Sequence, residues 1–266
     1  MGPDGAGTTP VDESADRVAV VTGASRGLGA GLASAFAAEG MDLGLCARVW
    51  PVPPPRSRAV VAALDVTDAA AVDTFAAAVV ERFGRIDLWI NNAGILGPIG
   101  PLAGADPTLL RRTLDVNVLG VLHGSATFAR HVRARPGGGV LVNMSSGAAV
   151  KPYEGWAAYC ASKAALEMVT EVVALEERGS GLRAYALSPG LVDTDMQELI
   201  RATPAERFPR VERFRRAHRE GAFNSAGWVA HYILRELMGA AVVPGDADGG
   251  TDAVRRRVPE EPQRGQ

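Results

Sequence analysis

The stretch Arg17-Val-Ala-Val-Val-Thr-Gly-Ala-Ser-Arg-Gly-Leu-Gly-Ala30 decides the fold. Residues 17–22 are a short apolar run that ends at Gly23, as expected of a buried parallel strand. Residues 28–39 are rich in alanine and are followed by Gly40, which indicates a helix with a glycine stop. A glycine-rich turn between strand and helix lets the backbone approach a pyrophosphate, because Cβ atoms are missing and the helix N-terminus presents free N–H groups. Taken alone, the turn is also compatible with a tight structural connection.

Short apolar runs and longer helical patterns alternate along the rest of the chain. Further strands are predicted at 42–47, 59–64, 86–90, 139–144, 183–187 and, as a short last strand, 242–243. Helices are predicted from Thr67 or Asp68 through Arg82, at 107–134 and at 157–178. Strands that alternate with helices form βαβ units. The sequence therefore predicts an α/β fold, a single doubly wound Rossmann-like domain whose seven-stranded parallel sheet carries helices on both faces.

The two ends of the chain differ from this pattern. Residues 1–16 are polar and rich in glycine and proline, and they are expected to be a flexible N-terminal tail without the apolar segment of a signal peptide. Residues 17–252 are expected to form the domain. Residues 253–266, with three successive arginines and two prolines, are expected to be a flexible C-terminal tail. Within the domain, residues 50–55 read Trp-Pro-Val-Pro-Pro-Pro and predict a link that cannot be the interior of a helix.

The composition excludes several classes of function. The chain has 266 residues with 28 basic and 30 acidic side chains, and its net charge of −2 gives no reason to expect nucleic acid or an acidic membrane as a partner. No run of about 18 apolar residues is present, so no membrane span is expected. The two cysteines are far apart and the four histidines are scattered. No metal site is therefore predicted, and a reducing, cytoplasmic compartment is expected.

A tyrosine and a lysine form a second notable group, Tyr159-Cys-Ala-Ser-Lys163. Four residues apart, they share one face of the predicted helix. A phenol with a pKa of about 10 is a poor acid at neutral pH. A nearby ammonium group stabilises the phenolate by up to about 4 kcal/mol, so Lys163 is expected to lower the pKa of Tyr159. Tyr159 would then be a usable proton donor to a carbonyl oxygen; an exposed helical pair without a catalytic role is the alternative.

A third group, Asn143-Met-Ser145-Ser146, stands at the end of a predicted strand. Ligands of parallel α/β sheets bind beyond the carboxyl ends of the strands. The serine hydroxyls could therefore point into the same crevice as the glycine turn and hydrogen-bond a substrate oxygen. A serine-rich loop that caps the next element is the alternative.

Together, these three groups in this order resemble the short-chain dehydrogenase/reductase family. The chain also shows that family's Asn91-Asn92-Ala93-Gly94 after the fourth strand, Asn117 in the following helix, and Pro189-Gly190 followed by Thr194. The resemblance covers residues 17–200 most clearly. It implies hydride transfer with a nicotinamide cofactor, in which the protein aligns hydride donor, carbonyl and proton donor.

The resemblance also implies roles for particular residues. Tyr159 would be the catalytic acid or base, and Lys163 would lower its pKa and hold the nicotinamide ribose. Ser146 would polarise the substrate carbonyl, with Ser145 as the fallback. Asn117 would position a water in the proton relay to Lys163. The implied cofactor-binding residues are Gly23, Ser25, Arg26, Gly27, Leu28, Gly29, Arg48, Asp65, Val66, Asn91, Ala93, Gly94, Tyr159, Lys163, Pro189, Gly190, Val192 and Thr194.

The choice between the two nicotinamide cofactors depends on the charge near the adenine ribose, where the resemblance places Asn91. An acidic residue about 20 positions past the glycine turn would bind a ribose 2′-hydroxyl and repel a 2′-phosphate. This chain has Arg48 in that region and no acid, and Arg26 within the turn. Guanidinium groups suit a phosphate through paired hydrogen bonds. The sequence therefore predicts NADP(H); an Arg48 that only solvates a loop is the alternative.

A narrower resemblance concerns the substrate. Residues 151–160, 174–177 and 193–197 resemble the sepiapterin reductase branch and the bacterial benzil (1,2-diketone) reductases. This resemblance implies an NADPH-dependent reductase of activated ketones, in which Ser146, Trp156 and Asp248 would contact the substrate. Residues 206–216 would be either a substrate lid or a solvated amphipathic helix. The resemblance also suggests a homodimer or homotetramer through the helices near 107–134 and 157–178. A pathway-specific ketoreductase of a natural-product ketone and a non-catalytic nucleotide-binding scaffold are the alternatives.

Overall fold

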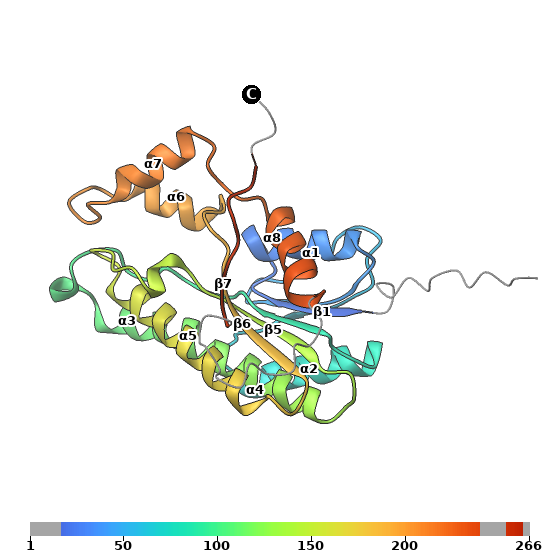
Figure 1. Cartoon of the computed structure of the whole chain (residues 1–266). Helices are drawn as coiled ribbons and strands as arrows, with labels where there is room; N and C mark the ends of the chain where they lie inside the picture. The colour runs from blue at the N-terminus through green and yellow to red at the C-terminus, as the bar shows by residue number, and fades with distance from the viewer. Residues whose placement is uncertain (1–16, 240–253, 263–266) are drawn as a thin grey trace, which may run out of the picture.

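The computed structural model describes residues 17–239 and 254–262 (Figure 1). Seven strands form one sheet in the order β3-β2-β1-β4-β5-β6-β7, and all neighbouring strands are parallel. This confirms the predicted fold class. Because β1 lies between β2 and β4, the crevice where ligands bind in such sheets is expected beside its carboxyl end. The strands are β1 (Val18–Thr22), β2 (Asp42–Ala47), β3 (Ala59–Ala63), β4 (Leu88–Asn91), β5 (Gly139–Met144), β6 (Leu182–Ser188) and β7 (Arg255–Arg257).

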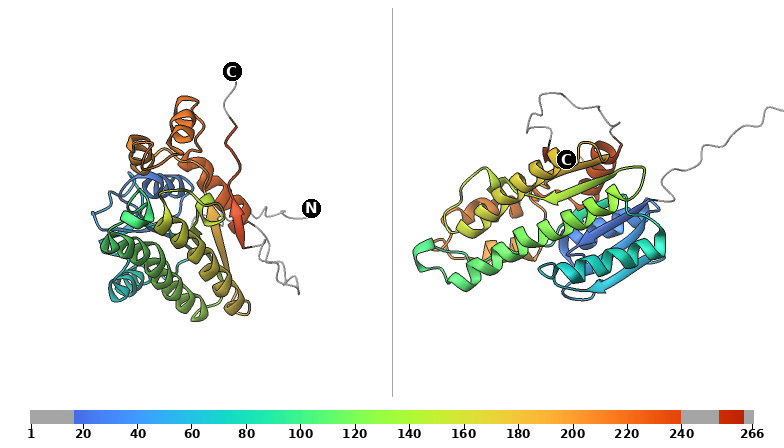
Figure 2. Two further views of the ribbon diagram at one scale, coloured as in Figure 1. Left: turned by 90° about the vertical axis from the view of Figure 1, so that its left-hand side faces the viewer. Right: turned by 90° about the horizontal axis from the view of Figure 1, so that it is seen from below.

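Helices cover both faces of the sheet. On one face lie α1 (Gly27–Ala38) and α8 (Ala226–Tyr232), which a π-helical turn (Ile233–Met238) continues; on the other lie α2 (Ala69–Phe83), α4 (Gly120–Arg133) and α5 (Ala157–Glu176), as Figures 1 and 2 show. Each face has its own apolar core. Leu32, Phe36 and Ile233 are fully buried in the first, and Trp89 and Phe128 are fully buried in the second. Burial of each such side chain contributes about 1.5–3 kcal/mol to folding.

The long helix predicted at 107–134 is interrupted. The structure divides it into α3 (Pro107–Leu114), a π-helical segment (Asp115–Leu119) and α4. The side chain of Asn117, inside the π-helical segment, accepts a hydrogen bond from the Ile95 N–H at 2.8 Å and donates one to the Ile95 carbonyl at 2.8 Å. A π-helical segment inside a helix often marks a functional site. Here it ties the helix to the loop that follows β4.

Two short helices, α6 (Asp195–Ala202) and α7 (Val211–Arg219), follow β6 and lie apart from the sheet layers at its carboxyl end (Figure 1). The predicted lid segment at 206–216 includes the first two thirds of α7. Its apolar residues Phe208, Val211 and Phe214 are buried. Residues 206–216 are therefore packed onto the domain through one apolar face.

The C-terminal residues include a strand where the sequence predicted only a flexible tail. Residues 253–266 were expected to be a tail because three arginines in a row lack any apolar pattern, yet Arg255–Arg257 form the edge strand β7 beside β6. Backbone pairing needs no apolar side chains, and Val258, which follows, is buried in the core. The short strand expected at 242–243 lies outside the described residues, as do residues 1–16.

The proline-rich link behaves as predicted. Residues 48–58 join two parallel neighbours, β2 and β3, without a helix. In the described parts of the chain, no helix is long and apolar enough to span a bilayer.

Candidate active site

A cavity of about 740 Å³ opens at the carboxyl end of the sheet, within the size range of small-molecule sites. The glycine turn after β1, the ends of β4, β5 and β6, and helices α5, α6 and α7 all contribute to its lining. The structure brings nearly all of the predicted site residues to this one cavity. Asn91 and Asn117 do not line it, and Asp248 lies outside the described residues.

The glycine turn forms one end of the cavity and leaves no room for side chains. Gly23 has a φ of +68°, and a Cβ built on Gly29 would lie 2.3 Å from the Gly23 carbonyl oxygen. Helix α1 begins at this turn, and no side chain caps its N-terminus. Its first N–H groups are therefore available to a phosphate. The residues present at this end of the cavity fit the pyrophosphate of a nicotinamide dinucleotide.

The two arginines predicted to bind a 2′-phosphate both line the cavity but differ in their contacts. Arg26 forms an ion pair with Asp195 at 2.8 Å, and both side chains are exposed. Such an exposed pair contributes only about 0–1 kcal/mol, so a ligand phosphate can replace the carboxylate. Arg48 is exposed and has no ion-pair partner among the described residues. Arg48 is therefore the arginine better placed to bind a phosphate.

Asp65 and Val66 line the cavity just beyond β3, as predicted. The Asp65 carboxylate accepts hydrogen bonds from the Thr67 backbone at 3.0 Å and from Arg112 at 2.6 Å. Partial burial alone would raise the pKa of Asp65, but the hydrogen bonds from Arg112 and Thr67 outweigh it and hold the pKa at about 2. The carboxylate is thus charged at neutral pH and fixed in one orientation.

The side chain of Asn91, predicted to lie by the adenine ribose, does not line the cavity. It is buried, and its amide accepts from the Trp89 indole at 2.8 Å and donates to Asn143 at 2.8 Å. Side chains alternate across a strand. The next residue, Asn92, therefore lines the cavity instead, and its amide donates to the Thr22 carbonyl at 3.0 Å.

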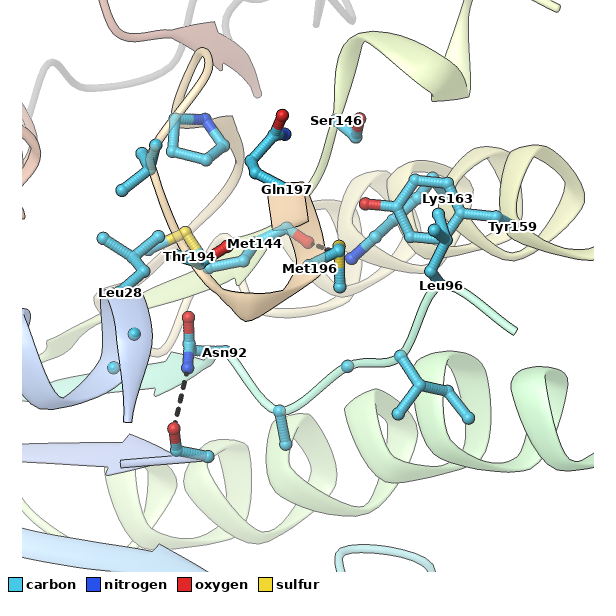
Figure 3. A pocket seen from close by; sticks show the side chains of 18 of the residues that line it. Leu28, Asn92, Leu96, Met144, Ser146, Tyr159, Lys163, Thr194, Met196 and Gln197 are labelled. Carbon is cyan, nitrogen blue, oxygen red and sulfur yellow. Dashed lines mark hydrogen bonds between the residues drawn. The ribbon is translucent and has the colours of Figure 1, made fainter. Parts of the chain in front are cut away.

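Tyr159, Lys163 and Ser146 all line the cavity, Tyr159 and Lys163 from α5 and Ser146 from the loop after β5 (Figure 3). Tyr159 and Lys163 are both buried and lie one turn apart on α5, with the lysine Nζ 5.6 Å from the centre of the tyrosine ring. The same Nζ donates a hydrogen bond to the Met144 carbonyl at 2.6 Å. Ser146, two residues further along from β5, accepts a hydrogen bond from the Ala148 N–H at 3.2 Å. The structure thus brings Tyr159, Lys163 and Ser146 to the same cavity, as predicted.

The pKa of Tyr159 differs in direction from the expectation that it is lowered. Burial raises the pKa of Tyr159 to about 12, and hydrogen bonding with Ser146 offsets only part of that rise. Burial lowers the pKa of Lys163 to about 8, against the opposing effect of the Glu167 carboxylate. The net result is a raised rather than a lowered pKa of Tyr159, because loss of water around the phenolate dominates and the Lys163 ammonium is directed to the Met144 carbonyl. The phenol is neutral at pH 7, which is the state that a proton donor needs.

Asn117, predicted to position a water in the proton relay to Lys163, does not line the cavity. Besides its two bonds to Ile95, its amide donates to the Ser162 hydroxyl at 3.0 Å, and the residue is buried. Both Asn117 Oδ1 and Lys163 Nζ lie near Gly94, within 4 Å of where a Cβ on that glycine would be. The described contacts therefore show Asn117 holding the loop after β4 close to Lys163.

The substrate end of the cavity is aromatic. Trp156 stacks on Phe208 with ring centres 4.6 Å apart and meets Tyr159 edge to face at 5.7 Å; Tyr153 and Phe214 complete the cluster. Two polar atoms of residues that line this end are buried without a hydrogen-bond partner among the described residues, Trp156 Nε1 and Gln197 Oε1. A buried polar atom without a partner costs about 1–3 kcal/mol. These two atoms are candidates for contacts with a ligand.

Several residues of the site were not predicted from the sequence. Gln197 belongs to the quoted stretch 193–197 but was not singled out, and Leu96, Tyr153, Met196, Arg213 and Phe214 also line the cavity. Met196, Gln197, Arg213 and Phe214 reach the cavity because α6 and α7 lie over the end of the sheet, and Leu96 and Tyr153 reach it from the loops after β4 and β5. These placements depend on tertiary packing, which no local sequence pattern signals.

Comparison with known proteins identifies the family. The profile of the short chain dehydrogenase family matches residues 17–205. The chain therefore belongs to the short chain dehydrogenase family, and it is an oxidoreductase that acts on CH–OH or C=O groups.

Named relatives within this family differ in substrate. A galactitol 2-dehydrogenase from Agrobacterium fabrum is 36% identical over 194 residues, covering 70% of this chain and 75% of that protein. A benzil reductase ((S)-benzoin forming) from Bacillus subtilis is 36% identical over 159 residues, covering 59% of this chain and 65% of that enzyme. A 3beta-hydroxysteroid dehydrogenase 1 from Eggerthella lenta is 34% identical over 205 residues, covering 74% of this chain and 78% of that enzyme.

Solved structures agree with the fold. The crystal structure of the KRED1-Pglu enzyme matches with a TM-score of 0.75 and 31% identity, covering 91% of this chain and 100% of that one. A short chain dehydrogenase/reductase from Burkholderia phymatum, solved in complex with NAD, matches with a TM-score of 0.73 and 26% identity, covering 85% of this chain and 87% of that one. Family membership thus implies a nicotinamide cofactor.

Proposed function

We propose that this protein is an NADPH-dependent carbonyl reductase that transfers hydride to an activated ketone. The proposed substrate is a 1,2-diketone that resembles benzil or sepiapterin. The observation that carries the proposal is the buried, neutral phenol of Tyr159, which shares one cavity with Ser146, Lys163 and the glycine turn. A phenol that keeps its proton at neutral pH can give it to an oxygen anion as that anion forms.

The side chains divide the reaction between them. When bound, the nicotinamide cofactor supplies the hydride that adds to the carbonyl carbon. The Ser146 hydroxyl hydrogen-bonds the carbonyl oxygen, and Tyr159 protonates that oxygen to complete the alcohol. Lys163, held by the Met144 carbonyl, places a positive charge beside the phenol and stabilises the phenolate that remains.

The lining of the substrate end supports a ketone with a second polar group. The aromatic walls suit aryl or other flat apolar substituents. The Trp156 indole N–H can donate to a second carbonyl oxygen, and the Gln197 amide can bond an adjacent hydroxyl or N–H. Benzil reductases from Bacillus subtilis and Bacillus cereus, 36% and 37% identical to this chain, support a 1,2-diketone.

The experiment that tests the proposal follows absorbance at 340 nm with NADPH and, separately, NADH. Benzil, a second 1,2-diketone, sepiapterin and a simple aldehyde are the substrates. Consumption of NADPH with a diketone is the expected result. Preference for sepiapterin would change the substrate class. Turnover of none of the four with tight NADPH binding would contradict the diketone proposal and favour a reductase of another ketone or a scaffold.

The cofactor preference is predicted to depend on Arg48. The Arg48→Ala variant should raise the KM for NADPH about tenfold or more, because a charged hydrogen bond to the 2′-phosphate is lost, and should change the KM for NADH little. Steady-state kinetics with each cofactor measure this. Arg82→Ala is the matched control, because Arg82 lies on α2 over the Phe83 ring and does not line the cavity. An unchanged NADPH preference in Arg48→Ala would overturn the NADP(H) assignment to this arginine.

We also propose that the protein is a homodimer or homotetramer that assembles through α4 and α5. Met168, Val172 and Leu175 recur at helical spacing on α5 and are 56%, 43% and 55% exposed. Leu119, the last residue of the π-helical segment, and Leu122, near the start of α4, are also exposed. Exposed apolar stripes of this kind mark protein interfaces.

The Leu175→Glu variant is predicted to dissociate the assembly, because it places a charge within the apolar stripe. Light scattering after size-exclusion chromatography should report a multiple of 27.8 kDa for the wild type and a smaller mass for the variant. Val52→Glu changes an equally apolar but separate residue, 84% exposed in the proline-rich link, and should leave the mass unchanged. A monomeric wild type would contradict the proposed assembly.

A further inference from the structure

A carboxylate lies directly behind the catalytic residues and has no role in the reaction described above. Tyr159, Lys163 and Glu167 follow one another at four-residue steps on α5 and therefore share one face of the helix. Glu167 is buried, and it does not line the cavity. One of its carboxylate oxygens contacts Ser145 after β5, next to Ser146, and the other contacts Arg255 of β7.

Two hydrogen bonds connect α5 to the two residues before Ser146, and a third, from the Asn143 amide to the Thr170 hydroxyl at 2.9 Å, connects the helix to β5 one residue earlier. Lys163 Nζ donates to the Met144 carbonyl at 2.6 Å, and the Ser145 hydroxyl donates to Glu167 Oε1 at 2.6 Å. These bonds fix the two residues that precede Ser146 in the chain. The position of the Ser146 hydroxyl relative to Tyr159 therefore depends on both bonds.

The C-terminal strand contributes the counter-charge. Arg255 of β7 reaches across to α5, with its Nε 3.4 Å from Glu167 Oε2 and 2.6 Å from Glu171 Oε1. The Arg255 guanidinium thus pairs with both carboxylates on the face of α5 that also carries Lys163.

We propose that Glu167 is a positioning residue for the reduction, which orients Ser146 through Ser145 and holds the charge of Lys163, and that Arg255 of the C-terminal strand keeps Glu167 in place. The kinetic part of this proposal rests on the proposed reductase function; the electrostatic part does not. The structural alternative is that Glu167 only fastens β7 to α5, and in that case Glu171 would be its equal.

The charges around Lys163 predict a direction for the effect. Two ionisable groups on its own helix interact with Lys163, namely Tyr159 and Glu167. From the other elements, Lys163 contacts the Met144 carbonyl of β5, and Arg255 of β7 pairs with Glu167. Burial lowers the pKa of Lys163 to about 8, and the Glu167 charge limits that fall. Removing this charge lowers the pKa further, so Lys163 loses its proton at a lower pH.

The first test needs no substrate. The chain has only two lysines, Lys151 and Lys163, so protein labelled with ¹³C at lysine Cε gives two side-chain signals, one exposed and one buried. In Glu167→Gln, the titration of the buried lysine should move down by about one pH unit. Glu171→Gln is the matched control, because Glu171 is also buried and paired with Arg255 but does not touch Ser145. Equal titrations in wild type and Glu167→Gln would overturn the electrostatic part.

The second test is kinetic and uses whichever ketone the wild type reduces. Glu167→Gln should lower kcat about tenfold with little change in KM, and the alkaline fall of its rate should begin at a lower pH. Ser145→Ala, which keeps the Glu167 charge, should lower kcat without moving the lysine titration. In the double variant the two losses of kcat should not multiply, because both remove the same link.

The outcomes separate the two proposals. A wild type that reduces no ketone but shows the shifted lysine titration would contradict the reductase function and support the electrostatic part alone. Equal losses of kcat and of thermal stability in Glu167→Gln and Glu171→Gln would show a fastening role only and overturn the positioning role. Should Glu167→Gln not fold, Ser145→Ala still tests the link to Ser146, and an unchanged kcat there would overturn it.

Discussion

Replacing Tyr159 with phenylalanine is expected to lower kcat for ketone reduction by about 10³-fold, while the fold and the cofactor affinity remain. The variant removes only the hydroxyl, so the edge-to-face contact with Trp156 is kept. A loss of 10³-fold corresponds to about 4 kcal/mol of transition-state stabilisation, the size expected when an alkoxide must find its proton in water instead of at a fixed phenol. Stopped-flow kinetics at saturating NADPH measure the effect.

The pH dependence provides a second expectation for the same residue. With the pKa of Tyr159 raised to about 12, the phenol stays protonated through neutral and mildly alkaline pH, so it does not limit reduction there. Oxidation of the alcohol requires the phenolate, and its rate should therefore rise with pH up to about pH 8, where Lys163 begins to lose the charge that stabilises the phenolate. Tyr185→Phe on β6, outside the cavity, is the control and should keep wild-type kinetics. A Tyr159→Phe variant with more than a tenth of wild-type kcat would rule out the tyrosine as proton donor.

Much of the fold could be predicted from the sequence because its signals are local. The apolar run before Gly23 and the alanine-rich helix after it are continuous in sequence, and the structure has β1 and α1 there. The prolines of residues 50–55 exclude a helix by their own geometry. The strand β7 shows the limit of such reasoning. Its three arginines carry no apolar signal, because an edge strand is held by backbone bonds to β6 and by the ion pairs of Arg255.

The candidate site likewise combines features that local sequence signals predict with features that depend on tertiary packing. Tyr159 and Lys163 could be placed together because residues four apart share one face of a helix. Ser146 could be added because ligands bind beyond the carboxyl ends of parallel strands and because of the family resemblance. The burial of Asn91 and the direction of the Tyr159 pKa depend on packing between segments distant in sequence. The bond between Ser145 and Glu167 likewise joins residues from two different elements. Four-residue spacing from Lys163 was the one local signal that could have suggested Glu167.

Gly29→Ala is expected to lower the affinity for NADPH by about 10²-fold or more. The added Cβ would lie 2.3 Å from the Gly23 carbonyl oxygen and 2.6 Å from the Asn92 amide nitrogen. Neither neighbour can yield easily, because the first is backbone and the second is hydrogen-bonded to the Thr22 carbonyl. Helix α1 must then move away from the turn by roughly 1 Å, and displacements of this size in a binding site cost about 10²-fold. Fluorescence titration with NADPH measures the dissociation constant without any substrate.

A second glycine on the same helix separates a binding effect from a general packing effect. A Cβ on Gly31 would also meet a neighbour at 2.3 Å, but that neighbour is the Ala226 Cβ on α8, and Gly31 does not line the cavity. Both alanine variants should lose about 1–3 kcal/mol of stability through overpacking. Only Gly29→Ala should lose NADPH affinity, because only there does the displaced atom belong to the turn that faces the pyrophosphate. Equal dissociation constants for the two variants would place the cofactor phosphates elsewhere than on the N-terminus of α1.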